Sequence, residues 1–413
     1  MSSTILIIGL MVFFAHFLSL QFRKTNIPDV LVLMLIGIVI GPLLGIATPQ
    51  DFGKIGSLIA TIALVVILFE GGTSLNLAML GKSLGTTGLL SIACFVLTAI
   101  IIALGGFALG LTLLPATMLG VTLGGSTSAV VIPMVNALQL SEKPTTVLVL
   151  ESALTDVLCI VGVFALLQIH TQGGVEPGRL IGSVLASLIF AAAIGVLGGI
   201  GWLLVLGKVR DFPNTISSTL AYVFIVYGVT EMLGFSGAIA ALAMGITLTN
   251  FEKFGLHHVP SIDQNMVPLN EVDLVFYREA VFLLKTYFFV YLGISIHFGE
   301  VRLALAAVIM VLVAYAMRLG LTRFIFRDAG YSLRDAAITS MMAPKGLAAA
   351  VLASLPLEYG VAGGEVIRDA TYMVVLVSIT LTALLVIAYP LPATQKLYAR
   401  ALGKPLPDAN PQP

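Results

Sequence analysis

The chain has 413 residues, of which 58% are hydrophobic and only 10% are charged, and its formal net charge is zero. Soluble globular domains carry about 25% charged residues, so this composition excludes that class and predicts an integral membrane protein with many spans. A zero net charge provides no electrostatic footprint for nucleic acid, and we expect no such partner. The two cysteines have no metal-ligand spacing, so we predict no disulfide framework and no metal cofactor.

Hydropathy predicts thirteen transmembrane helices, and no strands are expected in this all-α chain. The predicted spans are 4–21, 28–46, 55–75, 85–109, 113–139, 145–169, 179–206, 214–233, 235–250, 275–297, 301–324, 335–356 and 369–390. The ninth span is short, and the tenth begins among polar residues. The first span has no basic region before it and no obvious cleavage site, so we expect it to be retained and not removed as a signal peptide.

Positive charge predicts the orientation of the chain, because Lys and Arg accumulate on the cytoplasmic side of membrane proteins. An odd number of spans places the two termini on opposite sides. With the N-terminus outside, thirteen of the 21 Lys and Arg residues lie in inside loops or the C-terminal tail, four lie outside, and four lie within or at the edge of spans. We therefore expect a multi-pass protein of the cell membrane with the N-terminus outside and 396–413 as a short cytoplasmic tail.

Two stretches of small residues predict close helix packing. The second span contains Gly37, Gly41 and Gly45, and this spacing lets two helix backbones approach each other. The seventh span contains the small-residue stretch 191–201. That stretch predicts either a dimer face or an internal helix crossing, and the sequence leaves both open.

The sixth span carries two carboxylates, Glu151 and Asp156, near its middle. Ionisable groups at that depth cost about 2.5–3.5 kcal/mol each on an insertion scale, and they usually mark function. Five helical residues rotate by about 500°, which leaves the two carboxylates about 140° apart and unable to share one close site. Ser152 and Asp156 share a face. We predict that one acid faces a water-filled cavity while a partner charge holds the other.

Two spans are interrupted by residues that break helices. The fifth contains two adjacent glycines, three hydroxyl residues and Pro133 within 124–133, and the twelfth contains Pro344, Lys345 and Gly346. A kinked helix explains either interruption alone. At membrane depth, backbone released from helical bonding must be buried in protein or line a cavity. Broken helices at corresponding places in two halves of a chain indicate a transporter site between inverted repeats.

Further charged residues occur at membrane depth, and buried charges need partners. They are Glu70, Glu231, Lys285, Arg318 and Lys345. Together with Glu151 and Asp156, and without residues at the rim of the membrane, three acids and three bases are available to neutralise one another. Their pairing is the main question that the sequence poses.

Four motifs in order resemble the monovalent cation/proton antiporter superfamily, closest to its sodium/proton exchanger branch. Glu151-Ser-Ala-Leu-Thr-Asp156 looks like the Glu-Ser-x-x-Asn-Asp of that branch, and Gly125-Ser-Thr-Ser-Ala-Val-Val131 sits where the family has its first unwound helix. Ala316-Met-Arg318 resembles the helix with the buried arginine. Ala343-Pro-Lys-Gly-Leu-Ala-Ala-Ala350 looks like the second broken helix, usually Gly-x-Arg-Gly. The resemblance extends to about residue 395.

The resemblance implies an antiporter fold of inverted repeats in a homodimer that works in the lipid bilayer. A transmembrane domain over 1–395 would contain a moving core domain of spans four to six and eleven to thirteen, about 85–169 and 301–390. The remaining spans would form the dimerisation or scaffold part. The implied activity is exchange of Na⁺ or K⁺ for H⁺ by alternating access, which serves pH homeostasis.

The resemblance also assigns roles to residues of the predicted site. It implies that Asp156 binds the cation and the proton alternately, and that Glu151 pairs with Arg318 as a structural tie. Oxygen ligands suit hard cations, and the candidates beside Asp156 are hydroxyl side chains and carbonyls of the broken helices. The hydroxyl candidates are Ser152, Thr127 and Ser126, together with Thr155.

Three positions depart from the family pattern. Thr155 stands where the exchanger branch has Asn and the electrogenic branch has a second Asp; it offers an oxygen but cannot titrate. Thr127 stands where many exchangers have Asp, so Lys345 has no obvious acidic partner across the two broken helices. Lys285 has no assigned role. One titrating acid predicts one proton per cation, which is an electroneutral exchange.

Other classes of function remain as alternatives. A channel-like K⁺ efflux protein could use the same charged core without moving protons, and an organic-anion symporter could use a related inverted repeat. The chain has no Gly-x-Ser-x-Gly or His-Glu-x-x-His motif, so we expect no enzyme activity and no cofactor.

Overall fold

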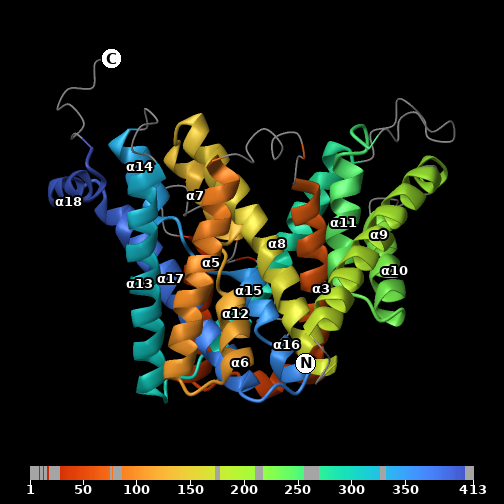
Figure 1. The fold of residues 1–413 in the computed structure, drawn as a ribbon, viewed down its shortest axis with the longest axis horizontal. Coiled ribbons are helices and arrows are strands. Elements are labelled where there is room, and N and C mark those ends of the chain that lie inside the picture. Colours follow the sequence, from red (N-terminus) through yellow and green to blue (C-terminus); the bar gives the residue numbers. More distant parts are fainter. Residues whose placement is uncertain are drawn as a thin grey trace. The chain divides into compact units, whose positions relative to one another are not determined.

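The protein is represented by a computed structural model that spans residues 1–413. The structure describes residues 28–74, 86–172, 177–209, 217–254, 269–325 and 332–404, together with Gly9, Phe13, His16, Phe17 and Leu77. These residues are helical or lie in turns and short connections, and no strand occurs among them (Figure 1). The fold is therefore all-α, as predicted.

The first half of the chain folds into helices whose labels follow Figure 1. They are α2 (Asp29–Ile38), the π-helix η1 (Val39–Leu43), α3 (Pro49–Ser74), α5 (Thr86–Ala108), α6 (Leu113–Thr122), α7 (Ser128–Leu138), α8 (Glu142–Gln172) and α9 (Pro177–Val209). The second half contains α10 (Ser218–Met232), α11 (Gly237–Thr249), α12 (Glu271–Ser295), α13 (Val301–Ile325), α14 (Leu333–Met341), α15 (Leu347–Leu352), α16 (Leu355–Glu358), α17 (Gly364–Ala388) and α18 (Pro392–Leu402).

The helices coincide closely with the predicted spans. The first span, 4–21, lies almost entirely outside the described residues, and each of the others corresponds to one or more helices. Within the described part of the chain, five helices are long and apolar enough to cross a membrane. Their apolar segments are Ser91–Ala108, Pro144–Thr171, Ala186–Leu206, Val301–Ile325 and Gly364–Ala388. Among the other spans, the fifth and the twelfth are broken, α10 and α11 are short, and α12 begins with charged residues.

Both predicted interruptions are present in the structure. The fifth span divides into α6 and α7, which 123–127 separates, and the twelfth divides into α14 and α15, which 342–346 separates. Pro344 has no backbone N–H to continue α14. Thr127 is extended, with φ −89° and ψ 126°, and this conformation lets α7 begin in a new direction.

The chain divides into two compact units. The first consists of Met1–Asp51, Ser83–Val163 and Thr286–Pro413, and the second of Phe52–Lys82 and Phe164–Lys285. The segments that we predict for a moving core, 85–169 and 301–390, belong to the first unit except for 164–169. The division of labour between a core and a dimerisation domain stays a prediction.

Glycines allow close helix contacts within each unit. In the first unit, Gly37 of α2 faces Gly293 of α12, and a methyl group on either glycine would overlap backbone of the other helix. In the second unit, a methyl group on Gly195 of α9 would overlap the backbone of Ala240 in α11. The small-residue stretch of the seventh span therefore forms an internal crossing, which the sequence left open beside a dimer face.

The C-terminal segment contains one element that hydropathy does not reveal. Residues 392–402 form α18. Its apolar residues are interrupted along the sequence by polar ones, so a search for long apolar runs does not find it. It ends at Gly403, which has φ 65°, a left-handed conformation that favours glycine at a helix C-terminus.

Candidate functional site

The two broken spans meet through their backbones in the first unit. The N–H of Thr127, between α6 and α7, donates a hydrogen bond to the carbonyl of Pro344, between α14 and α15, at 2.9 Å. The Thr127 side chain lies against Gly346, where an added Cβ would come within 2.5 Å of it. The extended segments thus satisfy part of each other's free backbone, as burial at membrane depth requires.

Thr155 of α8 holds the first break in place. Its hydroxyl oxygen accepts a hydrogen bond from the Ser126 N–H at 3.2 Å and lies 3.4 Å from the Ser126 carbonyl and 3.3 Å from that of Ser152. A hydroxyl has one proton, so it donates to one of these carbonyls at a time. Gly125 lies so close to α8 that a Cβ there would come within 3.0 Å of the Thr155 carbonyl oxygen.

Asp156, the next residue of α8, faces the beginning of α7. The Ser128 hydroxyl donates to Asp156 Oδ2 at 2.8 Å, and the Ser128 N–H lies 3.4 Å from the same oxygen. Ser128 is the first residue of α7, so the carboxylate sits at a helix N-terminus, where negative charge is favoured. Asp156 itself is half-buried.

Glu151 and Arg318 form a buried ion pair one and a half helical turns away from Asp156 along α8. Arg318 Nη2 donates to Glu151 Oε2 at 2.9 Å, and Nη1 donates to Oε1, so the pair is bidentate. The third donor of the guanidinium, Nε, reaches the Thr339 carbonyl of α14 at 3.0 Å. One arginine from α13 therefore connects α8 with the first half of the second broken span.

Lys345 lies in the second break and points to the first. Its ammonium, on a side chain that is 4% exposed, donates to the Gly125 carbonyl at 2.8 Å, and its backbone N–H donates to Ser378 Oγ of α17 at 3.0 Å. Among the described residues, the polar atom that the ammonium binds is this carbonyl, and no carboxylate lies within ion-pair distance of it.

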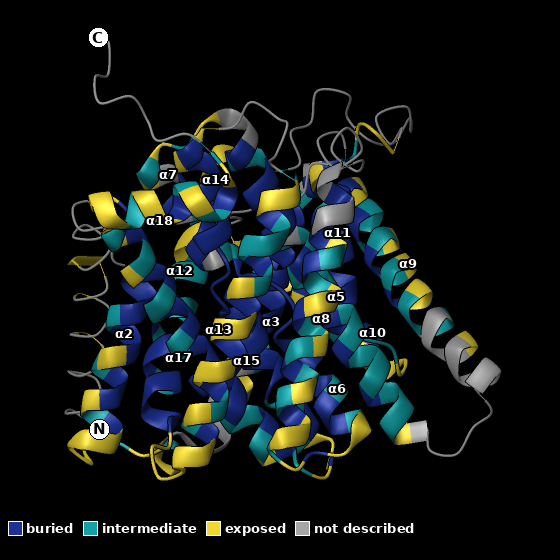
Figure 2. Ribbon diagram, turned by 60° about the vertical axis from the view of Figure 1, so that its left-hand side comes forward, coloured by how far each residue is buried: buried dark blue, intermediate teal, exposed yellow. Residues whose placement is uncertain are grey.

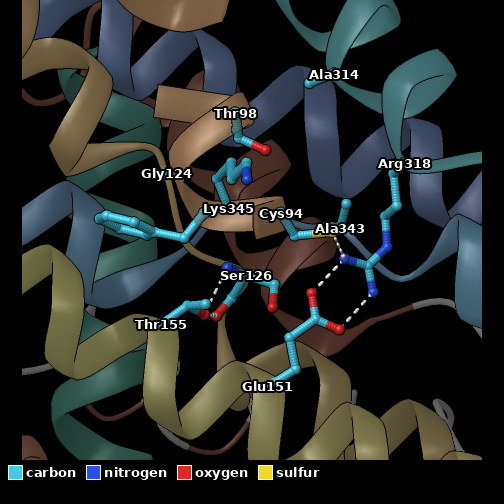
Figure 3. A pocket seen from close by; sticks show the side chains of 11 residues that line it. Cys94, Thr98, Gly124, Ser126, Glu151, Thr155, Ala314, Arg318, Ala343 and Lys345 are labelled. Atoms are coloured by element: carbon cyan, nitrogen blue, oxygen red, sulfur yellow. Dashed lines mark hydrogen bonds and ion pairs between the residues drawn. The ribbon is translucent and has the colours of Figure 1, made fainter. Parts of the chain in front are cut away.

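A small cavity lies between these groups (Figure 3). Its polar lining comprises Thr98, Ser126, Glu151, Thr155, Arg318 and Lys345, and Cys94 and Phe95 of α5 contribute to its wall. Figure 3 shows Arg318 joined to Glu151 and Ser126 joined to Thr155 on two sides of this space. With both bases and the acid ionised, the lining carries a net charge of plus one, so an unaccompanied cation is not favoured in the cavity itself.

The hydroxyls of α17 secure the second break. Ser378 accepts from the Lys345 N–H, while Thr382 lies 3.4 Å from the Met341 carbonyl at the end of α14. Tyr315 of α13 donates to the Ser378 carbonyl at 3.0 Å or to Thr382 Oγ1. These contacts use backbone groups that the break would otherwise leave unsatisfied.

The structure brings most of the predicted site residues together, with different surroundings for each. Ser152 is buried, and its hydroxyl donates to the Val149 carbonyl of its own helix at 3.0 Å. Lys285 belongs to the second unit, where its ammonium lies 5.7 Å from the Phe282 ring centroid. Glu231, also in the second unit, accepts from the Gly237 N–H at 2.7 Å and thereby caps α11.

Ser128 is the site residue that sequence reasoning missed. The run Ser126-Thr127-Ser128 contains three hydroxyls, and the prediction from sequence includes only the first two. Because α7 begins at Ser128, this side chain turns towards α8 while that of Thr127 turns to Gly346. The signal that could have identified it is its place as first residue after the extended segment.

Comparisons with known proteins agree with this fold. The profile of the transmembrane sodium/hydrogen exchanger family matches residues 9–387. The Na⁺/H⁺ antiporter NhaS2 of Synechocystis sp. is 25% identical over 308 residues, which are 73% of this chain and 53% of that protein. The K⁺/H⁺ antiporter NhaP2 of Shewanella oneidensis is 25% identical over 371 residues, 88% of this chain and 62% of the relative. The chain thus spans about half to two thirds of the length of these relatives.

A solved structure with the same fold is that of the sodium proton antiporter MjNhaP1 from Methanocaldococcus jannaschii at pH 8. It aligns with a TM-score of 0.71 and 20% sequence identity over 92% of this chain and 99% of that one. Because the family profile covers nearly the whole sequence, from residue 9 to residue 387, the chain belongs to the sodium/hydrogen exchanger family.

Proposed function

We propose that this chain exchanges Na⁺ or K⁺ for H⁺ across the membrane by alternating access, and that Asp156 binds the two ions in turn. The observation that carries the proposal is the position of Asp156. It is a carboxylate within an apolar helix, half-buried, beside the Ser128 hydroxyl at 2.8 Å and the backbone of a broken helix. A hard monovalent cation prefers such oxygen ligands, and a proton competes for the same carboxylate.

Ser128 joins the predicted ligands in this proposal. The cation would replace the hydrogen bond between Ser128 and Asp156 and would be bound by both oxygens. Thr155, Ser126 and Thr127 hold the extended backbone beside the carboxylate, and Ser152 precedes Asp156 by one helical turn. Exchange follows because one carboxylate cannot carry a proton and a cation at the same time.

Electroneutral exchange follows from the charges of the site. Asp156 and Glu151 carry two negative charges, and Arg318 and Lys345 carry two positive charges, so the site without a bound ion is neutral. Adding either a proton or a monovalent cation at Asp156 gives the same charge of plus one. The two loaded forms respond equally to the membrane potential, and one-for-one exchange then moves no net charge.

We assign the Glu151–Arg318 pair a structural role. Arg318 contacts Glu151 in α8 and Thr339 in α14, so it ties together the elements on which the binding carboxylate and the second break lie. Lys345 supplies positive charge to the first break from the second. It limits the cation affinity of Asp156, which favours release of the bound ion.

The proposal includes a homodimer in the cell membrane, with the N-terminus outside and the C-terminus in the cytoplasm. Its support is the excess of Lys and Arg in loops on one side of the predicted spans and the resemblance of the motifs. The names of the relatives, a Na⁺/H⁺ and a K⁺/H⁺ antiporter, support both cations as candidates.

The test is cation-driven proton flux in proteoliposomes with an entrapped pH dye. Na⁺, K⁺ and Li⁺ gradients are imposed in turn on wild-type protein and on Asp156→Asn. The exposed Glu300→Gln, an equivalent acid-to-amide change just before α13, is the control. We expect flux with wild type and control and none with Asp156→Asn. Full flux in Asp156→Asn would refute the proposed binding role.

A second measurement tests the stoichiometry. A potassium or lithium diffusion potential of either sign is applied to vesicles with an imposed cation gradient, using whichever ion the protein does not transport. One-for-one exchange predicts that the steady proton flux is independent of the potential. Cation flux without proton movement would instead indicate a channel.

A further inference from the structure

Helix α18 must lie where the membrane ends. It begins at Pro392, and only residues 389–391 separate it from α17, whose apolar segment Gly364–Ala388 is long enough to cross a membrane. Such a short connection cannot carry the helix away from the membrane surface. The element therefore runs at the boundary between lipid and water.

One face of α18 is fixed to the first unit. Tyr398 and Leu402 are buried, and the Tyr398 ring meets that of Tyr389 edge to face, with centroids 6.4 Å apart. Arg323, from the last turn of α13, donates to the Ala401 carbonyl at 3.2 Å. These contacts determine which residues of the helix face outward.

The outward face combines apolar and basic side chains. Leu391, just before α18, is 57% exposed and Leu397 is 65% exposed, and Lys396 and Arg400 are also exposed. Figure 2 shows exposed residues along α18. Arg334, at the start of α14, is also exposed and donates to the Leu138 carbonyl, so it adds positive charge to the same unit. Exposed leucines gain by entering lipid, and the basic groups need anions at the depth of phospholipid headgroups.

We propose that α18 is a binding surface for anionic phospholipids of the leaflet that faces the C-terminus. Leu391 and Leu397 enter the acyl region, while Lys396 and Arg400 contact the headgroup phosphates. A second protein copy would bury the leucines but would leave the two cations without a counter-charge from this helix, which has no acidic residue. Anionic lipid satisfies both requirements at once. The inference is independent of the ion that the protein transports.

The direct test places a fluorescent reporter on the outward face. Leu397→Trp introduces an indole at an exposed position, and the parent chain has a single tryptophan, Trp202, which is buried in the second unit and supplies a constant background. The full-length protein is reconstituted in phosphatidylcholine vesicles. These contain the same small fraction of a brominated lipid, either phosphatidylglycerol or phosphatidylcholine. Bromine quenches tryptophan only in its immediate neighbourhood.

We expect stronger quenching with brominated phosphatidylglycerol. One basic side chain near an anionic surface favours association by about fivefold, so enrichment of that order or more is expected around the helix. In the Leu397→Trp background, Lys396→Gln with Arg400→Gln removes the preference. Lys396→Arg with Arg400→Lys, the matched control, exchanges the residues but keeps both charges and the preference.

Two results would overturn the proposal. Equal quenching by the two brominated lipids would show that the helix has no preference for anionic lipid. Absence of quenching by either lipid would show that protein, including a second copy, or water covers this face. A measurement on the chain without the tryptophan substitution provides an independent check. Phosphatidylglycerol added to the detergent-solubilised protein should raise the thermal midpoint more than phosphatidylcholine does, and Lys396→Gln with Arg400→Gln should abolish the difference.

Discussion

The ammonium of Lys345 lies 2.8 Å from the carbonyl oxygen of Gly125, so the second broken span places a positive charge on the backbone of the first. The segment that receives this charge ends where α7 begins, at Ser128, and Ser128 binds Asp156. The carboxylate that we propose to bind the cation, Asp156, therefore lies close to a segment that already carries a positive charge of the protein, the Lys345 ammonium.

Removing the positive charge of Lys345 should tighten cation binding at Asp156. A unit charge at about 10 Å and an effective dielectric constant of about 20 contributes roughly 1.7 kcal/mol, so Lys345→Met should lower the apparent KM for the cation on the order of tenfold. The KM is measured at the same near-neutral pH for every variant, so that protons compete equally in all of them. The maximal rate should fall, because a more tightly bound ion leaves more slowly.

Lys345→Arg is the matched control for this prediction, because it keeps the charge and the ability to donate to the Gly125 carbonyl. Its KM should stay close to that of the wild type. An unchanged or higher KM in Lys345→Met would mean that the lysine acts only as a backbone clamp. The thermal midpoints of both variants report separately whether loss of the contact between Lys345 and the Gly125 carbonyl destabilises the protein.

The Glu151–Arg318 pair predicts a large asymmetry between single and double substitutions. Breaking a buried ion pair by removing one partner costs about 3–5 kcal/mol, because the other charge stays buried without compensation. Glu151→Gln should therefore lower the thermal midpoint strongly. The combination of Glu151→Gln with Arg318→Met should recover much of the loss, since it removes both charges.

This double substitution also separates structural support from ion binding. If Glu151 is a tie, the stabilised double variant should regain part of the exchange activity. A Glu151→Gln protein that is as stable as the wild type but inactive would contradict the assignment and would place Glu151 among the ion ligands.

The Thr155 hydroxyl should stabilise the extended segment 123–127 of the first break. Thr155→Val keeps the shape of the side chain but leaves the buried Ser126 N–H without its acceptor, at a cost of about 1–3 kcal/mol. Hydrogen exchange of the peptide around Ser126, followed by mass spectrometry, should become faster. The exchange activity should fall, because the extended backbone no longer keeps one geometry.

Two control variants sharpen this test. Thr155→Ser retains the hydroxyl and should behave like the wild type. Thr117→Val removes a hydroxyl from α6 that donates only to the Leu113 carbonyl of its own helix, so it should leave the exchange of the Ser126 peptide unchanged. Equal effects of Thr155→Val and Thr117→Val would rule out a specific role for Thr155.

The sequence could reveal those parts of the fold that depend on local chemistry. Pro344 and the adjacent glycines 124 and 125 locate the two breaks, because these residues cannot continue a helix favourably. Long apolar runs locate the spans. Gly37 indicates a close crossing but not its partner, since the approach to Gly293 depends on the tertiary fold.

Side-chain direction after a break was beyond the reach of sequence reasoning. Helical periodicity relates residues only within one helix, and it is lost across the extended segment 123–127. For that reason the sequence separates Glu151 from Asp156 on α8, whereas its prediction of Ser126 and Thr127 as ligands leaves out Ser128. Helix α18 was missed for a different reason: its few apolar residues are spread along a polar sequence.

Ser128 provides the sharpest prediction about the binding site, because the structure ranks it above its neighbour Ser126. The Ser128 hydroxyl is bonded to the Asp156 carboxylate, whereas Ser126 contacts α8 through its backbone N–H, which a substitution to alanine preserves. In the proposed bound form the Ser128 oxygen is a ligand of the cation, so Ser128→Ala removes one ligand and should raise the apparent KM for the cation by roughly tenfold. Ser126→Ala should change it less.

The pH dependence of exchange shows whether Ser128 binds the cation or only supports the structure of the site. If Ser128 binds the cation beside Asp156, removing its hydroxyl lowers the affinity of the site for the cation, so that the cation competes less well with protons for the carboxylate. Protons then inhibit at lower proton concentration, and the activity profile at a fixed cation concentration should move to higher pH. Raising the cation concentration should reverse that shift. A larger KM change in Ser126→Ala than in Ser128→Ala, with the thermal midpoints equal, would reverse the ranking of the two serines and assign the cation to the cavity side of Thr155.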